Sequence, residues 1–192
     1  MITPVAAVSD DQRVLVTFRL EHQIYALPIE PVAQIIEMVA LTPLPQVHPA
    51  IKGIVNWHGT LAPVIDLRRY WCLPEAPLRA DTHIILVRAH GRVTGLLVDA
   101  VMDVLDLHDR HVIRPADILP IGLNDTSPMI EGLAHTPAGL IVILDLEQLV
   151  THSALNLAEV SSALAASAQP TLADAEQPHD LAEPARLPEL MT

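Results

Sequence analysis

Residues 14–29, VLVTFRLEHQIYALPI, and residues 83–98, HIILVRAHGRVTGLLV, decide the fold. Each stretch contains two apolar runs rich in β-branched residues, and a short polar segment separates the runs. This pattern is typical of two antiparallel strands joined by a turn, and His90-Gly91 in the second stretch is a tight-turn sequence. The sequence therefore predicts two β-hairpins of the same design.

The similarity between the hairpins is part of a longer internal repeat. A shift of 69 residues aligns residues 14–36 with residues 83–105, and a shift of 79 aligns residues 51–67 with residues 130–146. The second alignment has five identities in seventeen positions, which pair Ile51 with Ile130, Gly53 with Gly132, Leu61 with Leu140, Asp66 with Asp145 and Leu67 with Leu146. Two collinear blocks in the same order indicate an internal duplication. The ten-residue difference between the shifts indicates an insertion around residues 108–124.

An all-β fold with two small barrels follows from this repeat. Each copy has about 60–70 residues and four or five short strands, too few for a stable open sheet. Its edges must be closed in a barrel or covered by the other copy. The apolar content is almost entirely aliphatic, which suits two small β-barrels packed through an aliphatic interface. Short helical turns are expected at residues 29–38 and 48–52.

The composition of the chain changes near residue 152, and this change divides the chain into three parts. Residues 1–12 are expected to be a flexible N-terminus, and residues 13–152 the folded unit. In residues 153–192 there is no glycine and only one basic residue, Arg186. Apolar residues at helical spacing predict a helix over residues 153–168, and the frequent prolines after Gln169 predict a disordered tail.

Composition and charge exclude several classes of function. The chain has 11 basic and 23 acidic residues, a net charge of −12 and 3% aromatic residues, so binding to nucleic acid or to an anionic membrane is not expected. The longest apolar runs are strand-sized, so insertion into a membrane is not expected either. The first ten residues lack the features of a signal peptide, which predicts a cytoplasmic protein.

The sequence offers little for catalysis or metal binding. His108 and His111 flank the cationic Arg110, and Cys72 is the only cysteine, so neither a metal site nor a cofactor is expected. A nucleophile elbow of the type Gly-x-Ser-x-Gly is absent. Asp66 and Asp145 each end an apolar strand, where hydrogen bonding to a helix or turn is favoured over acid–base chemistry. The sequence thus argues against an enzyme.

The segment at residues 51–60, IKGIVNWHGT, is unusual because two glycines bracket a polar tip that contains Trp57. One interpretation is a simple corner between two strands, where glycine permits a sharp turn. The other is a recognition surface, because tryptophan is enriched at binding hot spots.

Five motifs follow one another along residues 13–152: Tyr25-Ala-Leu-Pro-Ile29, Ile51-Lys-Gly-Ile-Val-Asn56, Pro63-Val-Ile-Asp-Leu-Arg68, Gly95-Leu-Leu-Val-Asp99 and Ile143-Leu-Asp-Leu146. In order and spacing they closely resemble the CheW chemotaxis coupling proteins. The resemblance implies two five-stranded SH3-like β-barrels around a shared hydrophobic centre. It also implies a non-enzymatic adaptor that joins the cytoplasmic tips of chemoreceptors to a CheA-type histidine kinase, whose regulatory domain has the same fold. Such an adaptor would lie in the cytoplasm, at membrane-associated receptor arrays.

The resemblance also implies a set of partner-binding positions. These are the apolar receptor-contact residues Val32 and Ile35, the loop residues Gly53 and Asn56, and the second-half residues Gly95 and Val104. Two positions depart from the family pattern: His58 replaces the usual arginine and Gln34 stands where an acid is common. Since a neutral histidine cannot form the bidentate contacts of arginine, we expect this corner to be adapted to a different receptor.

A different class of function is a small-molecule-binding double β-barrel or a cryptic enzyme. That class requires a polar-lined pocket with convergent titratable groups. The two classes differ in whether valine, isoleucine and leucine side chains fill the space between the barrels.

Overall fold

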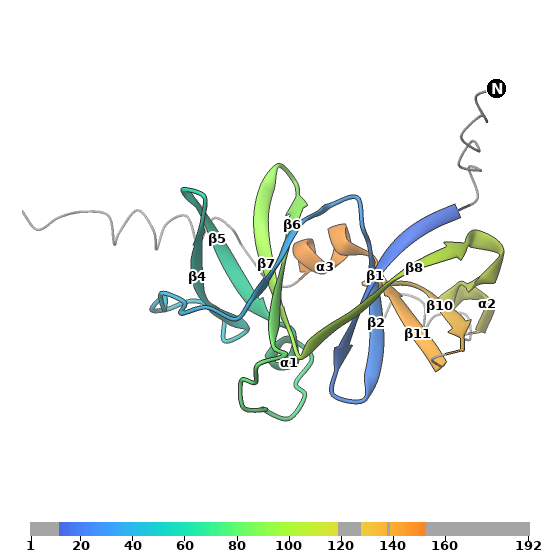
Figure 1. The fold of residues 1–192 in the computed structure, drawn as a ribbon, viewed down its shortest axis with the longest axis horizontal. Helices are drawn as coiled ribbons and strands as arrows, with labels where there is room; N and C mark the ends of the chain where they lie inside the picture. Colours follow the sequence, from blue (N-terminus) through green and yellow to red (C-terminus); the bar gives the residue numbers. More distant parts are fainter. Residues whose placement is uncertain (1–11, 119–127, 138, 153–192) are drawn as a thin grey trace, which may run out of the picture.

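The structure, a computed structural model, describes residues 12–118, 128–137 and 139–152. Its strands form two sheets that lie side by side (Figure 1). Sheet A contains, in spatial order, β8 (Ala100–His108), β1 (Gln12–Leu20), β2 (Gln23–Pro28), β11 (Gly139–Leu144), β10 (Ile130–Thr136) and β9 (Val112–Ile113). Sheet B contains β3 (Val32–Glu37), β6 (His83–Ala89), β7 (Arg92–Val98), β5 (Thr60–Asp66) and β4 (Ile51–Trp57). The all-β fold class is confirmed.

The two sheets have the same internal arrangement, as the duplication predicts. Shifts of 69 and 79 residues convert the strand order of sheet B into β8-β1-β2-β11-β10, which is the order of sheet A without β9. Each sheet has one parallel pair, β5 with β7 and β2 with β11. The register irregularity between Ile51 and Gly53 recurs between Ile130 and Gly132. The two sheets therefore repeat one topology, apart from β9.

Each sheet contains strands from both copies, because one strand of each copy crosses over. Strand β3 of the first copy pairs with β6, and β8 of the second copy pairs with β1. The helical turns expected at residues 29–38 are wrong, since Val32–Glu37 is strand β3. Pairing with β6 overrides the weak local preference of this segment. At residues 48–52 there is one backbone turn, in which Ile51 N–H donates to the His48 carbonyl at 2.8 Å.

The predicted insertion accounts for a difference between the sheets. The chain here forms the 3₁₀ turn Asp109–His111, strand β9 and helix α2 (Pro115–Ile118). Strand β9 makes sheet A six-stranded where five strands were expected; the first copy has only the isolated bridge between Thr42 and Ile54. The helix predicted at residues 153–168, the tail beyond it and residues 1–11 lie outside the described residues.

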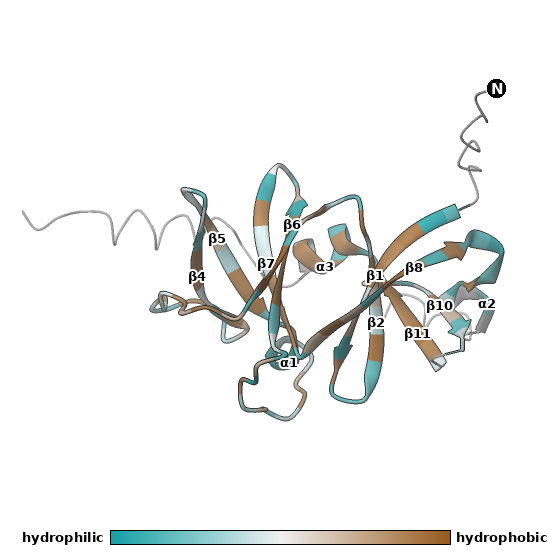
Figure 2. Ribbon diagram, viewed as in Figure 1, coloured by the Kyte–Doolittle hydropathy of each residue, from teal (hydrophilic) through white to brown (hydrophobic). Residues whose placement is uncertain are grey.

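Aliphatic side chains fill the space between the two sheets. This central cluster contains Leu27 from sheet A, Ile65 and Leu96 from sheet B, and Leu149 from α3 (Leu146–His152), each almost fully buried. Two smaller clusters lie inside the curled sheets, which we call barrel A and barrel B. Figure 2 shows hydrophobic residues along the central strands and hydrophilic residues at the turns. This filled centre is the arrangement expected for an adaptor. A polar cavity of about 270 Å³ lies beside it at the joint, and its lining includes Arg19, Arg68 and Asp99.

A ladder of aromatic rings joins sheet A to the segment after β5. The rings of Phe18 and Tyr25 stack with centroids 5.8 Å apart, and Tyr25 stacks on Trp71 at 5.0 Å. Trp71 follows directly after α1 (Leu67–Tyr70). Stacked pairs of this kind add about 0.5–1.5 kcal/mol to the burial of their area, so the ladder strengthens the joint between the sheets.

Asp66 and Asp145 begin the helices that follow β5 and β11. The Asp66 carboxylate accepts the backbone N–H groups of Arg68 at 3.0 Å and Arg69 at 3.2 Å, and the Asp145 carboxylate accepts that of Gln148 at 2.9 Å. These are N-cap contacts, as predicted. None of the helices among the described residues is long and apolar enough to cross a membrane.

Candidate functional site

The structure places seven of the eight predicted site residues in barrel B. Val32, Gln34 and Ile35 lie on β3, Gly53 and Asn56 on β4, His58 in the turn after β4, and Gly95 on β7. Val104 lies on β8 in sheet A. The predicted residues therefore form one group in barrel B and one separate position in barrel A.

Trp57 connects the two edges of sheet B. Strands β3 and β4 are the edge strands of this sheet, and the indole Nε1–H of Trp57 donates to Gln34 Oε1 at 2.7 Å. The guanidinium of Arg88, on β6, lies 5.5 Å from the centroid of the same ring, within the range of a cation–π contact. We call Gln34, Trp57 and Arg88 the Trp57 cluster. The predicted site residues do not include Trp57 or Arg88. The sequence did draw attention to Trp57, because tryptophan is enriched at binding hot spots.

The tip of the β4–β5 hairpin is held by its own hydrogen bonds. Asn56 Oδ1 accepts the backbone N–H of Gly59 at 2.9 Å. His58 and Gly59 have φ angles of 49° and 85°, the left-handed pair that a tight hairpin turn needs. The exposed His58 ring contacts Trp57 edge-on, with centroids 5.3 Å apart. Asn56 therefore shapes the tip, whereas His58 is available to a partner.

The two predicted glycines are buried and have a packing role. A Cβ at Gly53 would lie 2.6 Å from the Thr42 carbonyl oxygen, and the φ of Gly53 is +155°. A Cβ at Gly95 would lie 2.8 Å from Ile84 Cγ2. Neither residue presents a side chain to a partner, so each can influence binding only through the backbone that it holds in place.

Exposed apolar residues recur at equivalent positions in the two barrels. Leu61 is 50% exposed and its duplicate Leu140 is 42% exposed. Ile35 and Val104 are also both exposed, and they are related by the shift of 69. Large exposed apolar side chains are often part of contact surfaces. The duplication therefore repeats surface positions as well as core positions. The identity of Leu61 and Leu140 in the alignment of the two copies is the sequence signal that marks this pair.

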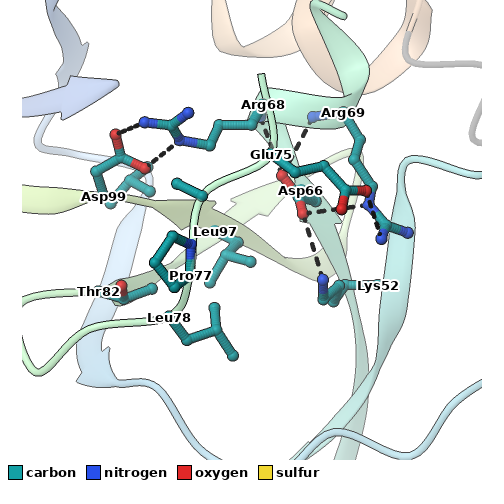
Figure 3. A pocket seen from close by; sticks show the side chains of 12 residues that line it. Lys52, Asp66, Arg68, Arg69, Glu75, Pro77, Leu78, Thr82, Leu97 and Asp99 are labelled. Carbon is teal, nitrogen blue, oxygen red and sulfur yellow. Dashed lines mark hydrogen bonds and ion pairs between the residues drawn. The ribbon is translucent and has the colours of Figure 1, made fainter. Parts of the chain in front are cut away.

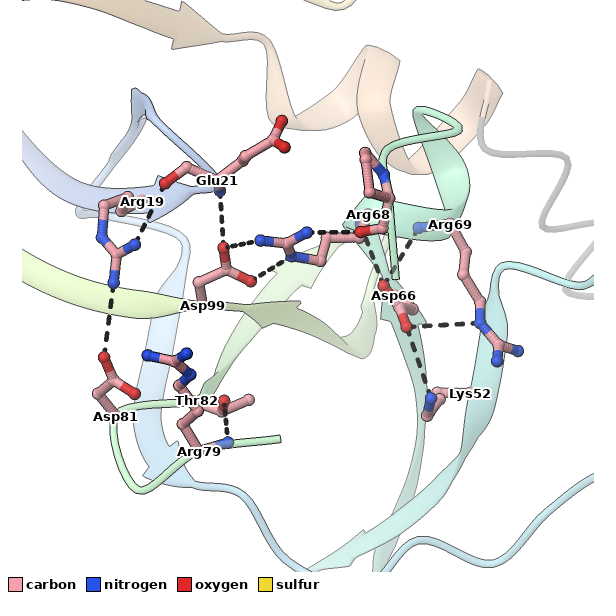
Figure 4. A network of polar contacts seen from close by, with 11 residues as sticks. Arg19, Glu21, Lys52, Asp66, Arg68, Arg69, Arg79, Asp81, Thr82 and Asp99 are labelled. Carbon is pink, nitrogen blue, oxygen red and sulfur yellow. Dashed lines mark hydrogen bonds and ion pairs between the residues drawn. The ribbon is translucent and has the colours of Figure 1, made fainter. Parts of the chain in front are cut away.

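A network of ion pairs lies at the joint between the barrels (Figure 4). Arg68 and Asp99 form a bidentate pair in which both N···O distances are 2.6 Å, and their side chains are only 15% and 17% exposed. The backbone N–H of Glu21 also donates to Asp99, at 2.6 Å. Burial acts to raise the pKa of Asp99, but the hydrogen bonds from Arg68 and Glu21 outweigh it, and the pKa is lowered.

The polar pocket beside this network is lined by charged side chains that pair with one another (Figure 3). The pocket measures about 50 Å³. Each of the six charged residues that line it belongs to an ion pair, and the pairs are Lys52 with Asp66, Arg68 with Asp99, and Arg69 with Glu75. The charges that line the pocket are thus balanced within the chain.

A metal site is not formed by the part of the chain that the structure describes. Within it, no three His, Cys, Asp or Glu side chains lie close enough together to hold an ion. The His108 and His111 rings contact each other edge-on, with centroids 5.9 Å apart. Cys72 is exposed and free.

Comparisons with known proteins agree on one family. The family model described as "CheW-like domain" matches residues 14–154. The chemotaxis protein CheW of Bacillus subtilis is 30% identical over 132 residues, which are 68% of this chain and 82% of the relative. CheW of Treponema pallidum is 25% identical over 153 residues, which are 78% of this chain and 88% of the relative. The crystal structure of the scaffolding protein TtCheW from Thermoanaerobacter tengcongensis superposes with a TM-score of 0.64 at 31% identity, covering 71% of this chain and 91% of that one.

Proposed function

Because this chain belongs to the CheW-like domain family, we propose that it is a non-enzymatic scaffold that couples chemoreceptors to a CheA-type histidine kinase. The observation that carries this proposal is the match of the family to both barrels together. The protein would act in the cytoplasm, at receptor arrays on the membrane.

We assign receptor binding to the exposed part of barrel B. Ile35 supplies an exposed apolar side chain and Val32 a half-buried one. Gln34, where the family commonly has an acid, accepts the hydrogen bond of Trp57, so it is not paired with a cation. His58 then supplies a ring beside Trp57 in place of the family's arginine. This surface suits a receptor tip that offers apolar contacts and few carboxylates.

Gly53 on β4 and Gly95 on β7 are buried in sheet B, so they would act on this surface by holding its backbone in position. Val104 lies in the other barrel, where we assign it to the contact with the regulatory domain of the kinase. A scaffold of this kind needs two surfaces that can be occupied at the same time, and the two barrels provide them.

Calorimetric titration of the full chain with two partners from the same cell tests the proposal. The partners are a receptor-tip fragment and the regulatory domain of the kinase. Ile35→Asp should weaken receptor binding at least tenfold, because the contact would desolvate the new charge. Val39→Asp is the matched control, since Val39 is also exposed but lies outside the predicted set; its affinity should stay within twofold.

The position of His58 permits a gain-of-function test. His58→Arg adds a permanent cation with five donors, and it should tighten binding to a carboxylate-bearing receptor tip by about 0.5–2 kcal/mol. Wild-type chain that binds neither the receptor tip nor the kinase domain would refute the proposed function. Kinase binding without receptor binding would refute the assignment of barrel B.

A further inference from the structure

The two barrels differ where their interior clusters reach the surface. In barrel B, Trp57 packs against an interior that includes Val55, Ala62 and Leu86. The shift of 79 makes Thr136 the counterpart of Trp57 in barrel A. The Thr136 hydroxyl donates to the Gly139 carbonyl in its own hairpin at 3.0 Å. Barrel A therefore has no large side chain at the position that the indole covers in barrel B.

A cavity of about 440 Å³ opens at this position in barrel A. We call it the mouth of barrel A, and its lining includes Ile24, Met102, Val104, Leu105 and Ile141. Ile141 belongs to the interior cluster, and Ile24 and Leu105 pack against it. Most of the walls are therefore apolar, and the size lies within the range of sites that bind small organic groups.

A hydrogen-bond acceptor stands at the rim of the mouth in the position that the indole would require. In barrel B the indole N–H of Trp57 is accepted by Gln34, and the shift of 69 makes Asp103 the counterpart of Gln34. The Thr17 hydroxyl holds the Asp103 backbone, donating to its carbonyl at 2.8 Å and accepting its N–H at 3.0 Å. Within the described residues, no donor contacts the exposed Asp103 carboxylate.

We propose that the mouth of barrel A binds a tryptophan side chain of a partner protein, with apolar walls around the ring and Asp103 accepting the indole N–H. Barrel B holds its own indole in this manner, so the chain itself shows the geometry. The counterpart of Arg88 is Arg19, which instead donates to the Glu21 carbonyl and pairs with Asp81. With a free carboxylate and no cation over the ring, the mouth favours a neutral or basic partner segment. The choice of a protein as the partner rests on the proposed function, which assigns Val104, a residue that lines the mouth, to a protein contact. The fit of the mouth to an indole ring does not depend on the proposed function.

Amide NMR titration of the full chain with N-acetyl-L-tryptophanamide tests this inference. Saturable shifts are expected at residues 102–105 and 141. N-acetyl-L-phenylalaninamide, which has no ring N–H, should bind at least threefold more weakly. In Asp103→Ala this preference should disappear, because the acceptor is gone. Absence of saturable shifts at the mouth, or an unchanged preference in Asp103→Ala, would overturn the proposal.

Two further variants test whether the mouth itself is the site. Thr136→Trp supplies the ring from within the chain and should weaken binding of the probe at least tenfold. Ile113→Trp adds a tryptophan at an exposed position on β9, away from the residues that line the mouth, and should leave binding within twofold. Met102→Asp changes an exposed side chain, so it should fold normally and still weaken binding at least fivefold. Probe binding that persists in both Thr136→Trp and Met102→Asp would overturn the proposal.

The outcome is separable from that of the proposed function. A chain that binds the kinase domain and the receptor tip, but not the probe, overturns the indole site and leaves the scaffold role intact. A chain that binds the probe at the mouth but neither protein partner supports the indole site and refutes the scaffold role.

Discussion

Asp99→Asn should reveal how strongly the joint between the barrels depends on one carboxylate. Asp99 lies between β7 and β8, where the chain passes from sheet B to sheet A. It accepts two hydrogen bonds from Arg68 and one from the Glu21 backbone, all at 2.6 Å. The substitution keeps the shape of the side chain but removes its charge and one of its two acceptor oxygens. Arg68 is then left partly buried without a counter-charge.

The expected cost lies between the values for surface and buried ion pairs. Hydrogen bonds to charged groups contribute about 1.5–3 kcal/mol, and removal of one partner of a fully buried pair costs about 3–5 kcal/mol. Since both side chains remain 15–17% exposed, we expect a loss of about 2 kcal/mol in the free energy of unfolding at pH 7. This is a large part of the stability of a typical domain.

The pH dependence of this difference follows from the lowered pKa of Asp99. A carboxyl whose pKa is lower in the folded than in the unfolded state stabilises the fold above its unfolded pKa of about 3.9. The stabilisation is lost as the pH falls through the folded pKa. The difference between wild type and Asp99→Asn should therefore be complete at pH 7 and decrease below about pH 4.

Urea unfolding followed by tryptophan fluorescence at several pH values measures the effect. Glu75→Gln is the control, because it breaks the pair of Arg69 with a 76% exposed partner; such surface pairs contribute about 0–1 kcal/mol. Equal destabilisation by the two variants, or a difference that stays constant from pH 7 to pH 3, would refute this reasoning.

Three other substitutions test the core, a close backbone approach and a turn. Leu144→Ala, in the central cluster, should destabilise by about 2–5 kcal/mol, and an unchanged denaturation midpoint would contradict its burial. Gly53→Ala should lower the melting temperature by several degrees, since its Cβ would lie 2.6 Å from the Thr42 carbonyl oxygen; a wild-type value would show that the strand can shift freely. Asn56→Ala should cost about 0.5–1.5 kcal/mol by removing the bond to Gly59 N–H, measured by thermal unfolding, and no loss would mean that the turn holds without it.

The hairpins and the duplication could be predicted from the sequence because both are local or collinear features. The crossing of β3 could not, because its pairing with β6 joins residues about fifty positions apart. Apolar and polar residues do not alternate in residues 32–37, VAQIIE, so this segment lacks the sequence pattern that marks a half-buried strand. The Trp57 cluster likewise joins three strands, and no spacing in the sequence brings Gln34 and Arg88 to one indole ring.

The ion pair at the joint escaped prediction for a different reason. The duplication relates Asp99 to Glu30, an acid in both copies, but it relates Arg68 to Glu147. The joint at Asp99 therefore has both an acid and an arginine, whereas the equivalent joint at Glu30 has an acid without the arginine. The resemblance placed Gly53 and Gly95 among the binding positions, and the structure shows that their space is taken by neighbouring chain. Their influence on binding stays a prediction.

The exchange of strands sets an order of events during synthesis on the ribosome. All five strands of sheet B lie within residues 32–98, so this sheet can be complete while the rest of the chain is still being made. The first hairpin, β1 with β2, must wait for β8 and β11, the latter ending at Leu144. At roughly 5–20 residues per second, synthesis from Pro28 to Leu144 takes about 6–23 s. During that time Leu15 and Ala26 lack the later residues of their cluster in barrel A, which are Leu107, Ala134, Ile141 and Ile143. The interior of barrel A can therefore close only after barrel B, although its first hairpin, β1 with β2, precedes barrel B in the chain.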